Sequence, residues 1–115
     1  MDALFRYLES IAPLSDDLRE YLTLSVKTKT LRKKEFLLKA GRVCDHIFFI
    51  EKGLVRFFYT EDDKEVSFRF VKEGELIIAD NFCRQIPSRA SIQALEDSCF
   101  YYISFRELQS IYVLF

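Results

Sequence analysis

Hydrophobic residues recur at helical spacing near the start of the chain. Four of them fall on one face of a helix: Leu4, Phe5, Leu8 and Ile11. Pro13 interrupts this pattern, because proline removes a backbone donor from a helix interior. Ser15 can cap a second short helix, since its hydroxyl can accept a hydrogen bond from a free amide of the first turn. Residues 1–26 are therefore predicted to form two short helices.

From about Val26 onward the hydrophobic pattern changes to an alternation with a period of two. The segment EVSFRFV places Val66, Phe68 and Phe70 on one face and Glu65, Ser67 and Arg69 on the other. The polar stretch TEDDK separates it from the apolar segment LVRFFYT and has the length of a hairpin loop. These two segments are predicted to form a β-hairpin.

Further short strands are predicted on both sides of this hairpin. The segments HIFFI, ASIQALE and CFYYIS have strand composition, and turn signals recur between them at Gly41, Gly53 and Gly74. Many short strands without helices between them are typical of a sandwich or barrel, so the expected class is mainly β. A last helix is predicted from Ser104 and Glu107, which have the spacing of a capping box.

Composition narrows the class of protein. The chain has 115 residues, of which 50% are hydrophobic, and a formal net charge of −1, which fits one folded domain. No uncharged apolar stretch is long enough to span a membrane, and the N-terminus lacks the apolar core of a signal peptide. The sequence therefore predicts a single cytoplasmic domain over residues 1–115, without membrane contact.

The few cysteines and the single histidine exclude several kinds of chemistry. Cys44, Cys83 and Cys99 are far apart and form no CxxC pair, so we expect ordinary thiols, with a reactive or redox-sensing role as the alternative. His46 alone cannot build a metal site of several histidines, and a structural role is expected for it. No catalytic triad or phosphate-binding glycine loop is present. We therefore expect no enzyme, no catalytic residue and no metal site.

Positive charge is concentrated between residues 27 and 42, where seven basic residues accompany one acidic residue. Such a run can indicate a nucleic-acid surface. However, Lys27 and Lys29 alternate with Thr28 and Thr30, which is typical of the solvated side of an edge strand that must avoid further pairing. We favour the edge strand and keep nucleic-acid binding as the alternative.

An ordered series of short motifs resembles the cyclic nucleotide-binding domain. The motifs are Lys34-Glu35, Ala40-Gly41, Phe48-Phe49-Ile50, Gly53-Leu54-Val55, Lys64-Glu65, Gly74-Glu75-Leu76 and the stretch from Pro87 to Glu96. The chain is similar, more narrowly, to the sensor half of Crp/Fnr-type bacterial transcription regulators, in the branch common among Bacteroidetes. The resemblance implies a jelly-roll β-roll over residues 27–103, with helices at 1–26 and from 104 to 115.

The resemblance also implies a ligand site between Gly74 and Leu95. In this family the glutamate after the cassette glycine holds the ribose of a cyclic nucleotide, and an arginine near the end of the cassette holds the phosphate. Transferred to this sequence, the candidate site comprises Gly74, Glu75, Leu76, Ser88, Arg89, Ala90 and Ser91. The implied ligand is cAMP, cGMP or another small anion.

The phosphate arginine is displaced by one residue in this sequence. Ser88 occupies the place of the family arginine, and Arg89 follows it. Because neighbouring residues of an extended chain point to opposite faces, this offset would direct Arg89 away from a phosphate. The cassette is about three residues longer than usual in the family, so its loop could restore the register, and Arg84 is a further cation in it.

The expected function is that of a ligand-sensing domain of a Crp/Fnr-type transcription regulator. Regulators of this family continue into a dimerisation helix and a helix-turn-helix, so we expect a fragment of a homodimeric protein that would contact DNA only through a C-terminal domain absent here. The apolar tail predicts self-association: Ile111, Tyr112, Val113, Leu114 and Phe115. The alternative is a degenerate roll that binds no nucleotide and serves as a dimerisation or docking scaffold. A cupin-like enzyme is a weaker third reading, because one histidine cannot supply its metal ligands.

Overall fold

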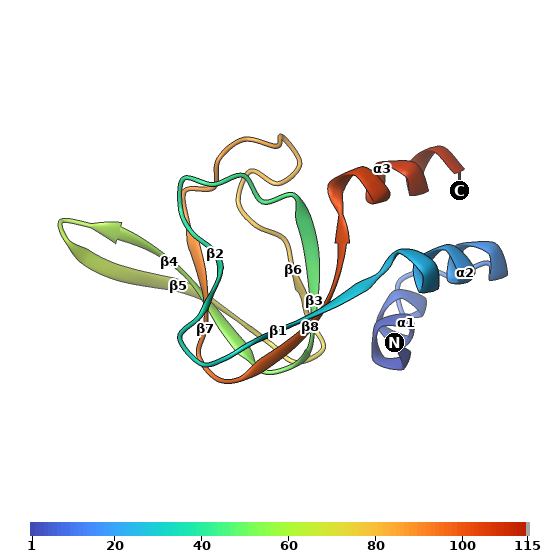
Figure 1. The fold of residues 1–115 in the computed structure, drawn as a ribbon, viewed down its shortest axis with the longest axis horizontal. Helices are drawn as coiled ribbons and strands as arrows, with labels where there is room; N and C mark the ends of the chain where they lie inside the picture. Colours follow the sequence, from blue (N-terminus) through green and yellow to red (C-terminus); the bar gives the residue numbers. More distant parts are fainter. Residues whose placement is uncertain (115) are drawn as a thin grey trace.

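The computed structural model describes residues 1–114 (Figure 1). Its helices are α1 (Asp2–Glu9), α2 (Asp16–Ser25) and α3 (Phe105–Leu114). Its strands are β1 (Lys27–Leu31), β2 (Phe36–Leu38), β3 (His46–Lys52), β4 (Leu54–Glu61), β5 (Lys64–Lys72), β6 (Leu76–Ile77), β7 (Ser91–Ala94) and β8 (Ser98–Ser104). Phe115, the last residue of the predicted apolar tail, lies outside the described residues.

The strands form two antiparallel sheets of four strands each. Their orders are β1-β8-β3-β6 and β2-β7-β4-β5, so consecutive strands often belong to different sheets. The predicted hairpin is present as β4 and β5, and it extends beyond the rest of the roll (Figure 1). β1 is an edge strand with Lys27 and Lys29 exposed, as predicted. The predicted class, a mainly β jelly roll with short helices at both ends, is confirmed.

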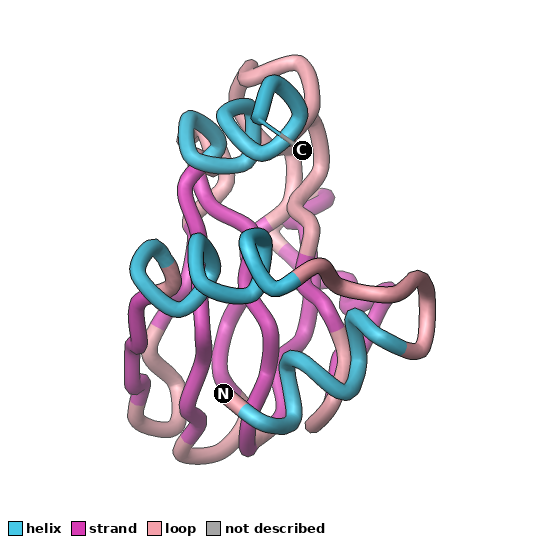
Figure 2. The backbone as a smooth tube through the Cα atoms, turned by 90° about the vertical axis from the view of Figure 1, so that its right-hand side faces the viewer, coloured by secondary structure: helices cyan, strands magenta, loops and turns pink. Residues whose placement is uncertain are grey.

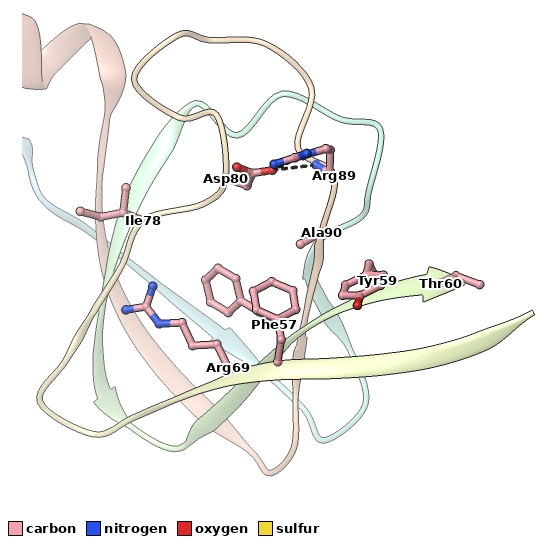
Figure 3. A pocket seen from close by; sticks show the side chains of 9 residues that line it. Phe57, Tyr59, Thr60, Arg69, Ile78, Asp80, Arg89 and Ala90 are labelled. Atoms are coloured by element: carbon pink, nitrogen blue, oxygen red, sulfur yellow. Dashed lines mark hydrogen bonds and ion pairs between the residues drawn. The ribbon is translucent and has the colours of Figure 1, made fainter. Parts of the chain in front are cut away.

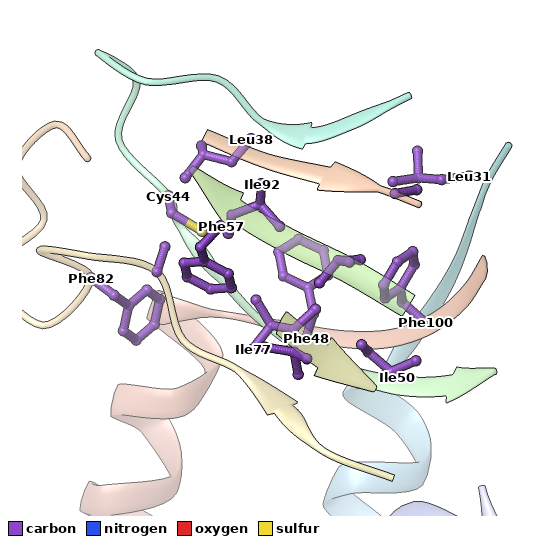
Figure 4. Close-up of a cluster of buried hydrophobic side chains, with 14 residues drawn as sticks. Leu31, Leu38, Cys44, Phe48, Ile50, Phe57, Ile77, Phe82, Ile92 and Phe100 are labelled. Carbon is purple, nitrogen blue, oxygen red and sulfur yellow. The ribbon is translucent and has the colours of Figure 1, made fainter. Parts of the chain in front are cut away.

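The hydrophobic core lies between the two sheets (Figure 4). Its most deeply buried side chains come from both of them: Ile50, Val55, Val71, Ile77, Ile92 and Phe100. At the turn between β3 and β4, Gly53 has a φ of 122° and lies against Ser98. A Cβ at this position would lie 2.0 Å from Ser98 Oγ and 2.8 Å from its Cα, so only glycine fits there.

The helices lie beside the sheet that contains β3 and β8 (Figure 2), where α1 packs on its outer face and Phe105 and Leu108 of α3 pack against the edge of the main core. Leu4 of α1 packs against Phe49 and Tyr101, and the N-terminal ammonium of Met1 donates to the Tyr101 hydroxyl over 2.7 Å. Both predicted caps are present. Ser15 Oγ accepts from the Leu18 amide, and at the start of α3 the Glu107 amide donates to Ser104 Oγ while the Ser104 amide donates to Glu107 Oε1.

Two aromatic residues of β5 depart from the expected arrangement. Phe57 and Phe58 of the neighbouring strand β4 are buried, and so is Tyr101 of β8. Phe68 and Phe70, however, are 53% and 59% exposed. They also do not share a face, because Phe68 lines one pocket and Phe70 lines another with Ser67. The strict alternation predicted for EVSFRFV is therefore wrong at this strand.

Candidate functional site

A pocket of about 640 Å³ lies between the β4–β5 hairpin and the loop that follows β6 (Figure 3). The hairpin supplies one wall and the segment from residue 78 to residue 90 supplies the other. Its lining residues are Phe57, Tyr59, Thr60, Phe68, Arg69, Ile78, Asp80, Arg89 and Ala90. The pocket is large enough for a small-molecule ligand and combines an aromatic surface with charged groups.

A β-bulge shapes the hairpin wall of this pocket. Phe57 pairs with Arg69 and Phe58 pairs with Ser67, so Phe68 is an extra residue without a partner on β4. A bulge re-aims side chains, and here it brings two consecutive residues, Phe68 and Arg69, to the same pocket. This bulge is the reason why the predicted alternation fails in β5.

The aromatic rings that line the pocket differ in exposure, from a buried ring to largely exposed ones. Phe57 is 3% exposed and lies edge-on to Phe68, with ring centres 6.1 Å apart. Tyr59 is tilted against Phe68 at 5.8 Å and is itself partly exposed. The guanidinium of Arg69 lies 5.3 Å from the ring centre of Phe57, within the range of a cation–π contact. Exposed rings beside a cation form a surface suited to a planar, negatively charged molecule.

The charged groups of the pocket are two arginines and one aspartate, a net charge of +1. Arg89 and Asp80 are paired: the Arg89 Nε–H donates to Asp80 Oδ2 over 3.1 Å, and the Arg89 backbone amide reaches the same oxygen at 3.4 Å (Figure 3). The Arg89 side chain is nevertheless 86% exposed. The guanidinium is therefore accessible to a ligand while it already holds a carboxylate.

The first half of the predicted cassette lies outside this pocket. Gly74 forms the turn between β5 and β6, and Glu75 Oε1 accepts from the Lys72 amide over 2.9 Å, which caps that turn. Glu75 is exposed and lines a separate hollow that shares Arg69 and Ile78 with the main pocket. Leu76 lines this hollow as well, and it packs against the cluster formed by Leu4, Phe49 and Tyr101.

In the second half of the predicted cassette, two residues line the pocket and two form hydrogen bonds with the surrounding backbone. Arg89 and Ala90 line the pocket. Ser88 is buried, and its hydroxyl donates to the Ala90 carbonyl over 2.8 Å. Ser91 Oγ accepts from the Ala40 amide over 2.9 Å. Of the seven candidate residues, the structure brings two to the main pocket and places five around it.

The direction of Arg89 differs from the one that strand alternation implied. Alternation applies to extended chain, but β7 begins only at Ser91 and Arg89 lies in a bend before it. The loop thus frees Arg89 from the alternation, and its side chain reaches the pocket wall. Arg84, the other cation of the loop, is exposed and is not a lining residue.

Two charged residues of the pocket, Arg69 and Asp80, were not predicted from the sequence. Arg69 was predicted to lie on the opposite face of its strand from Phe68, and no signal in the sequence reveals the bulge that brings both residues to the pocket. Asp80 lies within the segment identified as the cassette, and an acid nine residues before Arg89 was the available signal. The pocket charge therefore depends on residues that only the folded chain brings together.

In residues 1–114, no three His, Cys, Asp or Glu side chains come together as a metal site, and no helix is long and apolar enough to span a membrane.

His46 Nδ1 lies 2.6 Å from Asp45 Oδ1, and its ring packs on Tyr102. Burial raises the pKa of the Cys44 thiol, which donates to the His46 carbonyl.

Comparison with known proteins identifies a family. The family model of the cyclic nucleotide-binding domain matches residues 28–113. No curated protein shows significant similarity to the sequence. The fold is similar to the regulatory domain of Toxoplasma gondii PKA with cAMP, with a TM-score of 0.84 and 15% identity over 96% of this chain and 43% of that chain.

Two solved bacterial structures are also similar. The catabolite activator protein of Thermus thermophilus matches with a TM-score of 0.74 and 17% identity, over 87% of this chain and 47% of that chain. The N-terminal domain of a transcriptional regulator from Streptomyces coelicolor matches with a TM-score of 0.75 and 25% identity, over 87% of this chain and 72% of that chain. This chain thus spans less than half the length of the PKA and activator chains.

Proposed function

We propose, starting from the fact that this chain belongs to the cyclic nucleotide-binding domain family, that it is a regulatory domain whose pocket binds a small anion. The first candidate ligand is a cyclic nucleotide, cAMP or cGMP. The observation that carries this proposal is the pocket between the β4–β5 hairpin and the 78–90 segment, with Arg69 and Arg89 beside exposed aromatic rings. Bound cAMP in the similar PKA structure supports the same ligand class.

The charge of the pocket supports a monoanion. A cyclic phosphate has one negative charge, and the lining residues have a net charge of +1. Arginine is suited to phosphate because its guanidinium presents donors in a fixed plane. In this assignment Arg89 holds the phosphate, and the Phe68 and Tyr59 rings contact the base.

Glu75 is the candidate partner of the ribose hydroxyl, but it is less well placed for the ligand than Arg89. Its carboxylate already accepts from the Lys72 amide and lines a separate hollow that shares only Arg69 and Ile78 with the main pocket. Glu75 is not among the residues that line the main pocket, so a ligand held there by Arg89 would have to extend into the neighbouring hollow to reach its second carboxylate oxygen. Glu75 is therefore expected to contribute less to affinity than Arg89.

Thermal unfolding with saturating cAMP, and separately with cGMP, tests the proposal. A ligand at 100 times its dissociation constant stabilises a protein by about 2.7 kcal/mol, which is a shift of the order of 10 °C for a domain of this size. Arg89→Ala should lower the affinity about tenfold or more, because it removes a charge-assisted hydrogen bond.

Arg84→Ala is the matched control for that variant. Arg84 lies in the same loop, is equally cationic and does not line the pocket, so its removal should leave the affinity unchanged. Equal losses in both variants would indicate nonspecific attraction to the loop. No shift with either nucleotide would contradict the proposed ligand.

We also propose that the domain acts as the sensor of a Crp/Fnr-type transcription regulator. The similarity to an activator and to the N-terminal domain of a bacterial regulator supports this role. The net charge of −1 gives this domain no electrostatic basis for DNA binding of its own. Operator contacts would then belong to another domain, so the domain alone should not retard a DNA duplex in a mobility-shift assay.

The exposed end of α3 supports self-association in that role. Tyr112, Val113 and Leu114 are between 64% and 84% exposed, and contiguous apolar surface of this kind marks contact sites. We therefore propose a homodimer. Light scattering at high protein concentration should give twice the mass of one chain, and a monomer would contradict it.

A scaffold that binds no small ligand is the second candidate function. It is favoured by one observation: the arginine and the glutamate that a nucleotide would need are both engaged, Arg89 by Asp80 and Glu75 by Lys72. The nucleotide experiment separates the two functions. A scaffold predicts no thermal shift with any cyclic nucleotide together with an unchanged dimer in Arg89→Ala.

A further inference from the structure

We infer that Asp80 is a resident competitor of the ligand, a carboxylate that occupies the donors of Arg89 until an incoming anion displaces it. This inference rests on the proposed function of the pocket and deepens it, because it names a device that sets affinity and selects the ligand. Asp80 is the only acidic residue among those that line the pocket in the described part of the chain.

The geometry of Asp80 is that of a bound anion. One oxygen, Oδ2, accepts from the Arg89 side chain at 3.1 Å and lies 3.4 Å from the Arg89 backbone amide. Two donors converging from one residue on a single oxygen are the arrangement that a phosphate or carboxylate oxygen of a ligand would require. Figure 3 shows the two side chains meeting across the loop above the aromatic rings.

The pair also closes the loop that forms one wall of the pocket. The ion pair between Asp80 and Arg89 is the outer link across this loop. The inner link is a hydrogen bond in which Asn81 Nδ2 donates to the Pro87 carbonyl over 2.9 Å. Displacing Asp80 from Arg89 opens the outer of these two links and leaves the inner one in place. The loop can therefore exchange its internal carboxylate for a ligand without unfolding.

The exposure of the pair makes the exchange easy. Arg89 is 86% and Asp80 33% exposed, and ion pairs between solvated groups add little to stability. Once a ligand anion reaches Arg89, however, the Asp80 carboxylate remains close to it and repels it. Asp80 thus lowers the affinity for every anion, and only ligands that gain further contacts in the pocket overcome the loss.

Replacing the carboxylate by its neutral isostere tests this inference. Asp80→Asn should bind cAMP about fivefold or more tightly than the unmodified protein in titration calorimetry, because one repulsive charge is removed. Glu20→Gln is the matched control: Glu20 is exposed on α2, outside the pocket, and its replacement changes the net charge by the same amount. It should leave the affinity unchanged.

A second probe makes the result independent of the nucleotide. Inorganic phosphate titrated into ¹⁵N-labelled Asp80→Asn should shift the Arg89 Nε–H and backbone amide signals at lower concentration than in the unmodified protein. Asp80→Ala, which removes the acceptor altogether, should behave in the same way, and both variants should retain the dispersed spectrum of the folded domain. Arg89→Ala combined with Asp80→Asn should lose the effect.

The outcomes separate this inference from the proposed function. If no protein binds cAMP or cGMP but phosphate binds Asp80→Asn more tightly at Arg89, the nucleotide assignment fails and the role of Asp80 holds. If the unmodified protein binds cAMP and Asp80→Asn binds it no more tightly, the role of Asp80 is overturned and the nucleotide site stands. If phosphate shifts Arg89 equally in both proteins, the inference is likewise overturned.

Discussion

Phe57 and Phe68 are the same residue type on adjacent strands, and their rings are in contact, yet they belong to two different regions of the molecule. Phe57 is 3% exposed and is part of the core cluster, whereas Phe68 is 53% exposed. The contact between them, with ring centres 6.1 Å apart, joins the buried core to the exposed wall of the pocket.

The difference shows how one hairpin serves both stability and binding. On the inner side, the second sheet covers β4, and Phe57 and Val55 are packed against residues of both sheets. At the bulge, Phe68 of β5 is largely exposed and lines the pocket together with Tyr59. Side chains on the inner side should determine whether the domain folds, and those on the outer side should determine what it binds.

The largest effect is expected at the buried ring. Phe57→Ala should lower the free energy of unfolding by about 4 kcal/mol, because it removes a large buried side chain and leaves a cavity. Urea denaturation followed by circular dichroism measures this change. Phe57→Leu, which keeps most of the volume, should lose much less. A loss under about 1 kcal/mol for Phe57→Ala would contradict the assignment of this ring to the core.

A second large effect is expected at the turn that closes the core. Gly53→Ala should lower the free energy of unfolding by about 3 kcal/mol, because the new methyl group would meet Ser98 and alanine is strained at this positive φ. Gly74→Ala is the matched control. Gly74 also has a positive φ, but open space surrounds it, so its variant should lose only the strain component. Equal losses would refute the importance of the close approach.

The helices and the hairpin follow from local signals that the sequence contains. Ser15 and Ser104 are followed by the residues that complete their caps, and both caps are present. Strands β2 and β6 were not identified individually, because with three and two residues they are too short for a periodic pattern. Their pairing with β7 and β3 determines their conformation, and such pairing depends on the fold as a whole.

The sequence indicated one of the two walls of the pocket, but not the other wall or the directions of its side chains. The resemblance pointed to the segment after Gly74, and that segment does form one wall. The other wall depends on the bulge, which changes the side-chain direction of Phe68 and Arg69 without a glycine or proline to mark it. Arg89 turns toward the pocket because a bend precedes β7, and its partner Asp80 is set by the closure of a loop.

The next largest effect is a decrease of the free energy of unfolding at alkaline pH, to which the buried Cys44 should contribute and the exposed Cys83 should not. Burial raises the pKa of Cys44, whereas Cys83 is exposed. Because the folded-state pKa is the higher one, the stabilising contribution is complete below the ordinary pKa of cysteine and is lost as pH rises toward the folded-state pKa. Between pH 8.5 and 9.5 the stability should fall by about 1 kcal/mol per pH unit at most.

Urea denaturation at these two pH values tests the assignment to Cys44. The decrease should become shallower in Cys44→Ser, because the thiol that ionises in the unfolded chain is gone. Cys83→Ser, which replaces an exposed thiol by the same hydroxyl, is the matched control and should retain the slope of the unmodified protein. An unchanged slope in Cys44→Ser would show that another group, such as Tyr101, whose pKa is also raised by burial, causes the decrease.

The smallest effect on stability is expected at the exposed ring, where the effect on binding should be distinct. Phe68→Ala should change the free energy of unfolding by no more than about 0.5 kcal/mol, as is usual for exposed positions, while weakening cAMP binding about fivefold through the loss of an aromatic contact. Phe70→Ala is the matched control, because Phe70 is equally exposed but lines a different pocket with Ser67. Its variant should bind cAMP like the unmodified protein. Equal weakening in both variants would mean that the bulge does not separate the two faces of β5, and that Phe68 has no special relation to the ligand.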